Sequence, residues 1–144
     1  MRILIVHGAN LNLLGERQPE IYGTQTLDDL NDFIRAEGRR LNVELEFVQH
    51  NAEGAIIEAL HDARARFDAV VLNPGAYAHY SYAIADAIAS IPIPVVEVHL
   101  SNTAAREPHR RISVTGAAAR GTIAGFGQLS YVLALRALAE TPEK

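Results

Sequence analysis

The sequence contains no cysteine, and its only lysine is Lys144, the last residue. Without cysteine the chain cannot form disulfides, thiolate nucleophiles or zinc sites built on cysteine ligands. A lysine at the last position lacks the desolvated pocket that activates a lysine amine for imine formation. Pyridoxal chemistry, lysine–imine chemistry and a P-loop, which needs a lysine, are therefore disfavoured.

The chain also lacks an excess of positive charge and a long hydrophobic run. Its formal net charge is −4 at pH 7, which disfavours a nucleic-acid or membrane-surface footprint. No apolar run reaches the roughly 18 residues that are needed to span a bilayer. The first residues, MRILIVHGAN, are too soon interrupted to act as a signal peptide. We therefore expect a cytoplasmic protein with no nucleic-acid partner and no membrane partner.

Metal and nucleotide motifs are missing as well. The segment GFGQLS (125–130) lacks the third glycine of a GxGxxG motif and follows the last expected strand, and there is no GxSxG. The histidines form no HxH, HxxxH or HExxH pattern; they are His7, His50, His61, His79, His99 and His109. We therefore expect neither a metal nor a cofactor.

What the chain does contain is a regular alternation of strand-like and helix-like segments. Its 144 residues are 49% hydrophobic, which predicts one globular domain over 1–144. We predict a helix that begins at Thr26, with Asp29 as its capping partner, and another capped by Asn51. The alternation predicts an α/β flavodoxin-like domain whose five-stranded parallel sheet has helices on both faces. The expected strands are 2–7, 43–49, 68–73, 93–100 and 121–126, and two further helices are 80–90 and 128–140.

Polar side chains gather where the predicted strands end. The segments HGANLN (7–12), NPGAYAH (73–79) and HLSN (99–102) follow three of the strands. Ligands of such sheets bind outside the carboxyl ends of the strands, and neutral hydrogen-bonding groups suit a polyhydroxylated or carbonyl-bearing small molecule. Each segment also has a simpler interpretation, because asparagine caps helices and forms turns and a histidine can merely begin a helix. The functional interpretation depends on these residues converging at one edge.

The segment LGERQPEIYG (14–23) places an arginine and a tyrosine between two glycines, so we interpret it as a lid loop. A tyrosine is a poor base at neutral pH because its ordinary pKa is about 10, but an adjacent cation such as Arg17 stabilises the phenolate. Tyr22 as base and His99 as acid fit removal of a proton beside a carbonyl and loss of water, with the enolate held by asparagines. The alternative is a surface loop whose Tyr22 packs on the domain.

Three stretches of this chain resemble one known family. LIVHGANLNLLGERQPEIYG, NPGAYAHYSYAIADA and VVEVHLSN resemble the type II 3-dehydroquinate dehydratases in order and spacing over nearly the whole chain. The resemblance implies dehydration of 3-dehydroquinate to 3-dehydroshikimate through an enolate, in the shikimate route or in quinate breakdown, without metal or imine. Type I enzymes use a Schiff-base lysine, so the lysine content agrees with type II.

The resemblance also implies a role for each matching residue. Tyr22 matches the proton acceptor, Arg17 the arginine that supports the tyrosinate, and His99 the acid that protonates the leaving hydroxyl. Asn10 matches the asparagine that orients the water holding the enolate. The substrate-binding set is Asn12, Asn73, Gly75, His79, Asp86, Leu100, Ser101 and Arg110. Within this set an arginine fork suits a substrate carboxylate. The aspartate reaches a neighbouring subunit's site in the family, which implies a homo-oligomer, commonly a dodecamer of trimers.

Some positions depart from the family pattern or keep two interpretations. Gln18 stands where the loop usually has a glutamate, and His109 and Arg111 flank Arg110 in place of phenylalanine and histidine. Glu97, two residues before His99 on the same strand face, either orients that histidine or is only a strand residue. The competing function is a non-catalytic flavodoxin-like module that binds a ligand or a cofactor such as flavin.

Overall fold

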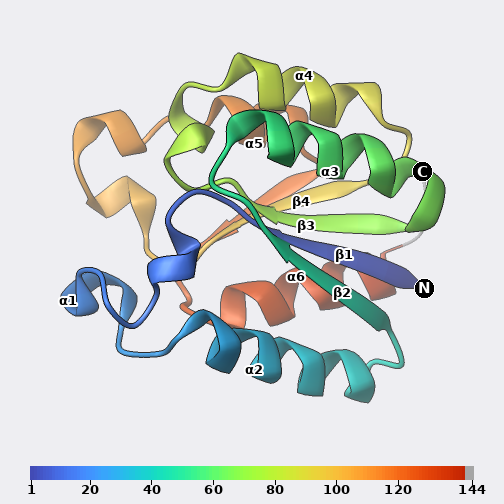
Figure 1. Ribbon diagram of the computed structural model, residues 1–144, viewed down its shortest axis with the longest axis horizontal. Coiled ribbons are helices and arrows are strands. Elements are labelled where there is room, and N and C mark those ends of the chain that lie inside the picture. The colour runs from blue at the N-terminus through green and yellow to red at the C-terminus, as the bar shows by residue number, and fades with distance from the viewer. Residues whose placement is uncertain (142–144) are drawn as a thin grey trace.

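A computed structural model describes residues 1–141; Lys144 and the last part of the polar tail lie outside the described residues (Figure 1). The strands are β1 (Arg2–His7), β2 (Glu44–Gln49), β3 (Ala69–Asn73), β4 (Val95–His99) and β5 (Gly121–Ala124). The helices are α1 (Pro19–Tyr22), α2 (Leu27–Arg40), α3 (Glu53–Arg66), α4 (Tyr82–Ser90), α5 (Val114–Ala118) and α6 (Leu129–Glu140). Short 3-10 turns are η1 (Leu11–Leu13), η2 (Gly75–His79), η3 (Thr103–Ala105) and η4 (Pro108–Arg110).

The five strands form one parallel sheet in the order β2-β1-β3-β4-β5, which confirms the predicted fold class. In its register His7 pairs with Asn73, and His99 pairs with Ala124. Because all strands point the same way, the segments that follow β1, β3 and β4 emerge at one edge of the sheet. The predicted convergence of polar segments at one edge therefore occurs.

The residues of each central strand alternate between two apolar cores. Ile3 and Ile5 face α2 and α6, and Leu4 and Val6 face α3 and α4. Figure 1 shows α3, α4 and α5 on one side of the sheet and α2 and α6 on the other. This alternation has period two, as expected for strands that are covered on both faces. It also decides which face each polar residue at a strand end joins.

Helix capping agrees with the sequence at one helix and differs at another. Thr26 and Asp29 form the predicted reciprocal capping box at the start of α2. The prediction for Asn51 is wrong, because α3 is preceded by Ala52 without a side-chain cap. The Oδ1 atom of Asn51 instead accepts from the backbone N–H of Asn10 at 2.9 Å, which ties two strand ends together. The side chain of Asn51 therefore forms a tertiary hydrogen bond in place of the expected helix cap.

Helix α4 begins at Tyr82, two residues later than predicted, and the hydroxyl of Ser81 accepts from the backbone N–H of Ile84. The apolar residues of α4, Ile84, Ala87 and Ile88, pack in the core on the α3 side of the sheet. They therefore offer no surface for assembly, whereas Asp86 is exposed. None of the helices within residues 1–141 is long and apolar enough to cross a membrane.

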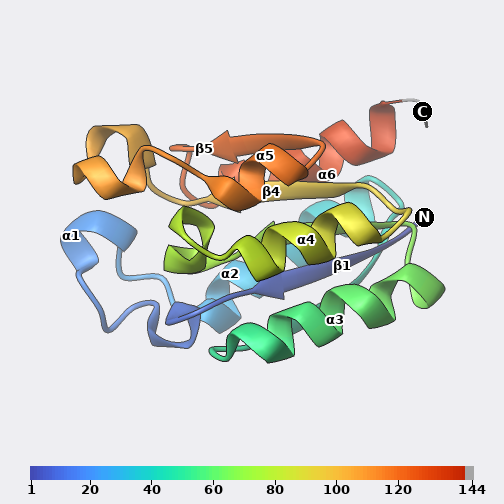
Figure 2. The same ribbon diagram turned by 90° about the horizontal axis from the view of Figure 1, so that it is seen from above.

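The sequence analysis missed α1, α5 and the four 3-10 turns. Each is five residues or shorter, and so carries too few apolar positions for a recognisable period. Two views show α1 and the segment that holds η3 and η4 at the same end of the molecule (Figures 1 and 2). That end is where the polar strand ends emerge.

Candidate active site

A cavity of about 160 Å³ lies at the carboxyl edge of the sheet, between the loops that follow β1, β3 and β4. It holds most of the residues that the sequence analysis singled out: Asn10, Arg17, Tyr22, Asn73, Gly75, His79, His99, Leu100, Ser101 and Arg110. Larger hollows of about 490 and 430 Å³ lie elsewhere, but neither contains any of these residues. The volume of a cavity therefore does not by itself identify the candidate site. The small cavity is distinguished by the chemistry of the side chains that line it.

Two of the predicted site residues do not line this cavity. Asn12, in η1, is exposed, and Asp86 is exposed on α4. Their side chains therefore lie apart from the others within one copy of the chain.

The hydroxyl of Tyr22 lies against two guanidinium groups. Nη1 of Arg106 donates to it at 2.8 Å, and Nη2 of Arg17 at 3.4 Å. Their guanidinium carbons lie 5.2 Å and 4.5 Å from the centre of the tyrosine ring. Positive charge this close stabilises a phenolate more than a neutral phenol. Tyr22 also packs against the apolar core, so the alternative interpretation of the loop holds for its ring but not for its hydroxyl.

Arg106 is the functional residue that the sequence analysis missed. Its side chain is only 12% exposed, and Nη1 also lies 3.3 Å from Oγ of Ser101. Its Nε is buried without a hydrogen bond, and the Oε1 atom of Glu107 is 3.8 Å away. Arginine density in REPHRR (106–111) was a usable signal, but the resemblance drew attention to Arg110 alone.

The lid turns tightly to bring Arg17 and Tyr22 together. Gly15 and Gly23 have φ angles of +89° and +80°, in the region that favours glycine. Gln18 has a φ of +37° and precedes the single turn of α1, which places Tyr22 back beside Arg17. The side-chain oxygen of Gln18 accepts from Nη2 of Arg17 at 3.4 Å. The departure at position 18 therefore lies in direct contact with the loop arginine.

His99 is held from behind by a buried carboxylate. Oε2 of Glu97 lies 3.0 Å from Nε2 of His99, and Glu97 is fully buried. Ser113 donates to the same carboxylate at 2.6 Å, and Thr115 donates to its other oxygen. Burial acts to raise the pKa of Glu97, but the bond and charge of His99 and the two hydroxyls outweigh it and lower the pKa. The carboxylate thus stays ionised and directs Nε2 inward, leaving Nδ1 as the ring nitrogen without this bond.

His79 lies beside His99 in the cavity. Its ring centre is 6.3 Å from that of His99, and its Nδ1 lies 2.8 Å from the carbonyl oxygen of Ile112. Burial lowers the pKa of His79, although the bond to this carbonyl acts in the opposite direction. A neutral His79 donates from Nδ1 to the carbonyl and keeps Nε2 as an acceptor.

The remaining charged residue of the lining is Arg110. Its Nε donates to Oε2 of Glu107 at 2.7 Å, and this bond lowers the pKa of the exposed Glu107. Asn10, with a left-handed φ of +70°, lies where β1 ends and is fixed through its backbone N–H. Within residues 1–141, no three His, Asp or Glu side chains gather as a group that could hold a metal ion.

Comparisons with known proteins agree on one family. A family model described as dehydroquinase class II matches residues 1–139. A 3-dehydroquinate dehydratase of Thermus thermophilus is 55% identical over 98% of this chain and 95% of its own length. That of Caldanaerobacter subterraneus is 48% identical over 95% and 93%. The crystal structure of a type II dehydroquinase from Butyrivibrio crossotus superimposes with a TM-score of 0.94 at 45% identity, over 96% of this chain and 97% of that chain.

Proposed function

The chain belongs to the class II dehydroquinase family and is an enzyme that dehydrates 3-dehydroquinate, and we propose that it does so with Tyr22 as base and His99 as acid. One observation carries this proposal: a phenol under two guanidinium groups and a carboxylate-backed histidine line the same cavity. The competing interpretation as a non-catalytic module has no support among these relatives, which are named as dehydratases.

In the first step, the phenolate of Tyr22 removes a proton from the carbon beside the ketone of the substrate. Arg106 and Arg17 stabilise the phenolate, because their Nη atoms lie 2.8 Å and 3.4 Å from its oxygen. The electrons of the broken C–H bond move onto the ketone oxygen and form an enolate. A water held by Asn10 stabilises that oxygen by hydrogen bonding.

In the second step, His99 protonates the hydroxyl that leaves as water, while the enolate collapses to the conjugated ketone of 3-dehydroshikimate. The buried carboxylate of Glu97 is bonded to Nε2 of His99 and holds the imidazole ring in place for this transfer. Arg110 is suited to bind the substrate carboxylate, because a guanidinium matches a carboxylate in shape and charge. The other substrate-binding residues are Asn73, Gly75, His79, Leu100 and Ser101, which share the cavity.

We also propose that the enzyme is a homo-oligomer, namely a dodecamer built of trimers. We propose that it acts in the cytoplasm. Tyr80, Tyr82 and Ile112 are 60%, 71% and 69% exposed, and His79 binds the carbonyl of Ile112, so apolar surface lies beside the cavity. Exposed apolar side chains that gather next to a site suit a subunit contact. Asp86, which does not line the cavity of its own chain, then has a role at the site of a neighbouring copy. Light scattering of the active protein tests this, and an active species of 15.7 kDa contradicts it.

The experiment for the mechanism separates its two steps in heavy water. In a His99→Gln variant, we expect the proton beside the ketone to exchange with solvent deuterium while the enone product fails to form. A Tyr22→Phe variant should show neither exchange nor product. His61→Gln, a histidine change on α3, serves as the control and should keep both. Loss of exchange in His99→Gln, or exchange that survives in Tyr22→Phe, would contradict the assignment of base and acid.

A further inference from the structure

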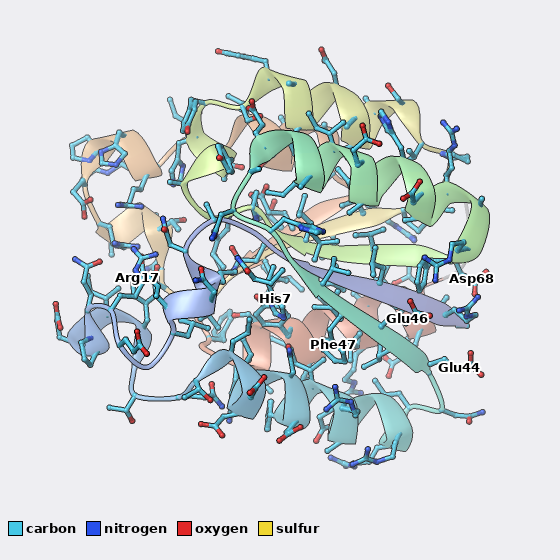
Figure 3. All side chains as sticks on the ribbon, viewed as in Figure 1. His7, Arg17, Glu44, Glu46, Phe47 and Asp68 are labelled. Atoms are coloured by element: carbon cyan, nitrogen blue, oxygen red, sulfur yellow. The ribbon has the colours of Figure 1, made fainter. Side chains whose placement is uncertain are left out.

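Four polar side chains from four elements form one chain of hydrogen bonds behind the wall of the cavity. Nε2 of His7 lies 2.7 Å from Oδ1 of Asn31, and Nδ1 of His7 lies 3.1 Å from the hydroxyl of Tyr131. Nδ2 of Asn73 lies 3.1 Å from the same hydroxyl. His7 and Tyr131 are fully buried, and Figure 3 shows His7 near the middle of the molecule, close to Phe47. The proposed reaction uses only Asn73 of these four.

The backbone of Gly75 fixes the direction of every bond in this chain. Its N–H lies 3.1 Å from Oδ1 of Asn73 and can only donate, so the amide oxygen faces Gly75 and the amide nitrogen faces Tyr131. The oxygen of Tyr131 therefore accepts from Asn73, and its single hydrogen goes to Nδ1 of His7. Nδ1 must then be unprotonated, so Nε2 carries the ring hydrogen and donates it to Asn31.

The charge states agree with this direction. Burial lowers the pKa of His7 to about 4, so its ring is neutral near pH 7. Burial also raises the pKa of Tyr131, so its hydroxyl keeps the hydrogen that it donates. The ring of Phe47 is stacked 6.4 Å from that of His7. The four hydrogen-bonded side chains are therefore uncharged, and the ring of Phe47 packs against His7. No donor and acceptor among them can exchange roles unless a hydrogen bond breaks.

We propose that His7 and Tyr131 are positioning residues that hold Asn73 with an amide N–H, and not its carbonyl oxygen, available to the cavity. Asn73 has two amide hydrogens, of which Tyr131 takes one, while its oxygen is engaged by Gly75. The substrate group that meets this wall must then be an acceptor oxygen, such as a hydroxyl or a carboxylate. This inference rests on the proposed role of Asn73 in substrate binding.

A double-mutant cycle tests whether Tyr131 acts through Asn73. Tyr131→Phe keeps the ring but removes the hydroxyl that orients the amide, and we expect kcat/KM to fall about 5- to 30-fold. In an Asn73→Ala background the same change should cost less than about 2-fold, because effects that act through one group are not additive. If Asn73→Ala does not fold, Asn73→Ser, which keeps an oxygen for Gly75, takes its place in the cycle.

Two further measurements separate positioning from loss of stability. Ile88→Val removes one methyl group from the opposite core and should lower the melting temperature while leaving kcat/KM near the wild-type value. Proton–nitrogen NMR of the His7 ring, recorded without substrate, should show Nε2 protonated and Nδ1 unprotonated near pH 7. The opposite tautomer, or an equal loss for Tyr131→Phe in both backgrounds, would overturn the inference. If the exchange experiment contradicted the roles of Tyr22 and His99, the expected tautomer of His7 and the expected double-mutant cycle would both still hold.

Discussion

The two sides of the cavity are built in different ways. The side of the proposed base, the base side, lies on the lid and on a second loop: Tyr22 and Arg17 belong to a lid of partly exposed residues, and Arg106 reaches Tyr22 from the second loop. The side of the proposed acid, the acid side, lies on strand β4, where Glu97 is fully buried and His99 is 7% exposed. The lid supplies charge at little cost to the fold, because Arg17 and Tyr22 are only partly buried. A buried carboxylate must have all its partners in place, because an unpaired one is costly.

This difference predicts that changes on the base side reduce activity without unfolding the protein, whereas changes on the buried side reduce both. Figure 3 places Arg17 and the acidic residues Glu44, Glu46 and Asp68 at opposite ends of the molecule. Arg2 contacts all three acidic residues through its backbone or side chain, and Glu46 also pairs with Arg66.

The largest effect should come from Tyr22→Phe. Removing the proposed base should lower kcat by about 10²–10⁴-fold while the melting temperature stays unchanged, because the ring keeps its packing. Enone formation followed by absorbance, together with a thermal melt, measures both. Tyr82→Phe is the matched control: it removes a tyrosine hydroxyl from a residue of α4 that is 71% exposed in one copy of the chain, keeps the apolar ring of the proposed subunit contact, and should remain active. Near wild-type activity of Tyr22→Phe would return the loop to a packing role.

The buried groups behind the cavity include His7 on β1, and through His7 the stability of the protein should depend on pH. Because the folded pKa of His7 is lowered to about 4, the unfolded chain takes up a proton first as the pH falls below about 6.5. The free energy of unfolding should therefore decrease between about pH 6.5 and pH 4, by about 3 kcal/mol in total. Denaturant melts at several pH values measure it.

The variant His7→Gln has no ring to titrate and should lose this part of the pH dependence. The slopes are compared between about pH 6.5 and pH 5. This range lies above the ordinary pKa of a glutamate such as Glu97, which is 4.5, so titration of carboxylates contributes little to the slope there. An unchanged slope in His7→Gln over that window would contradict the buried neutral state of the imidazole.

The guanidinium groups of the base side come next. Arg106→Ala and Arg17→Ala should each lower kcat by at least about 10- to 100-fold, since each removes a charged donor from the phenolate. Arg136→Ala, an exposed arginine of α6, is the control for loss of charge. Near wild-type kcat in Arg106→Ala and Arg17→Ala would show that these residues do not act on Tyr22.

The smallest effect should come from Thr115→Val, which is nearly isosteric and removes one donor from Glu97. We expect the free energy of unfolding to fall by about 1–2 kcal/mol near pH 7, and kcat to fall modestly as His99 loses its fixed support. Because the pKa of Glu97 is lowered in the fold, its contribution to stability is present above about pH 4.5 and is lost as the pH falls further. A Thr115→Val variant with full stability but reduced kcat would show that changes on the buried side can reduce activity without reducing stability.

Local sequence patterns were enough to predict the parallel sheet, the four longer helices α2, α3, α4 and α6, and the sheet edge where the cavity lies. Strand periods, the capping box of Thr26 and the polar segments after β1, β3 and β4 are local signals, and each strongly constrains its own neighbourhood. The motifs that resemble the family then singled out Tyr22, Arg17 and His99, all of which line the cavity. These residues are recognisable because each lies within a short, ordered run of matching neighbours.

The contacts between distant side chains around the cavity could not be predicted from local patterns, because they form only when the chain folds. Arg106 binds a tyrosine 84 residues away, Tyr131 binds a histidine 124 residues away, and Thr115 completes the shell of Glu97 from α5. Asn51 shows the same principle in reverse, because contact with Asn10 replaced its expected cap. Local pattern encodes periodicity and burial, whereas the pairing of remote polar groups depends on how loops and helices close over the sheet.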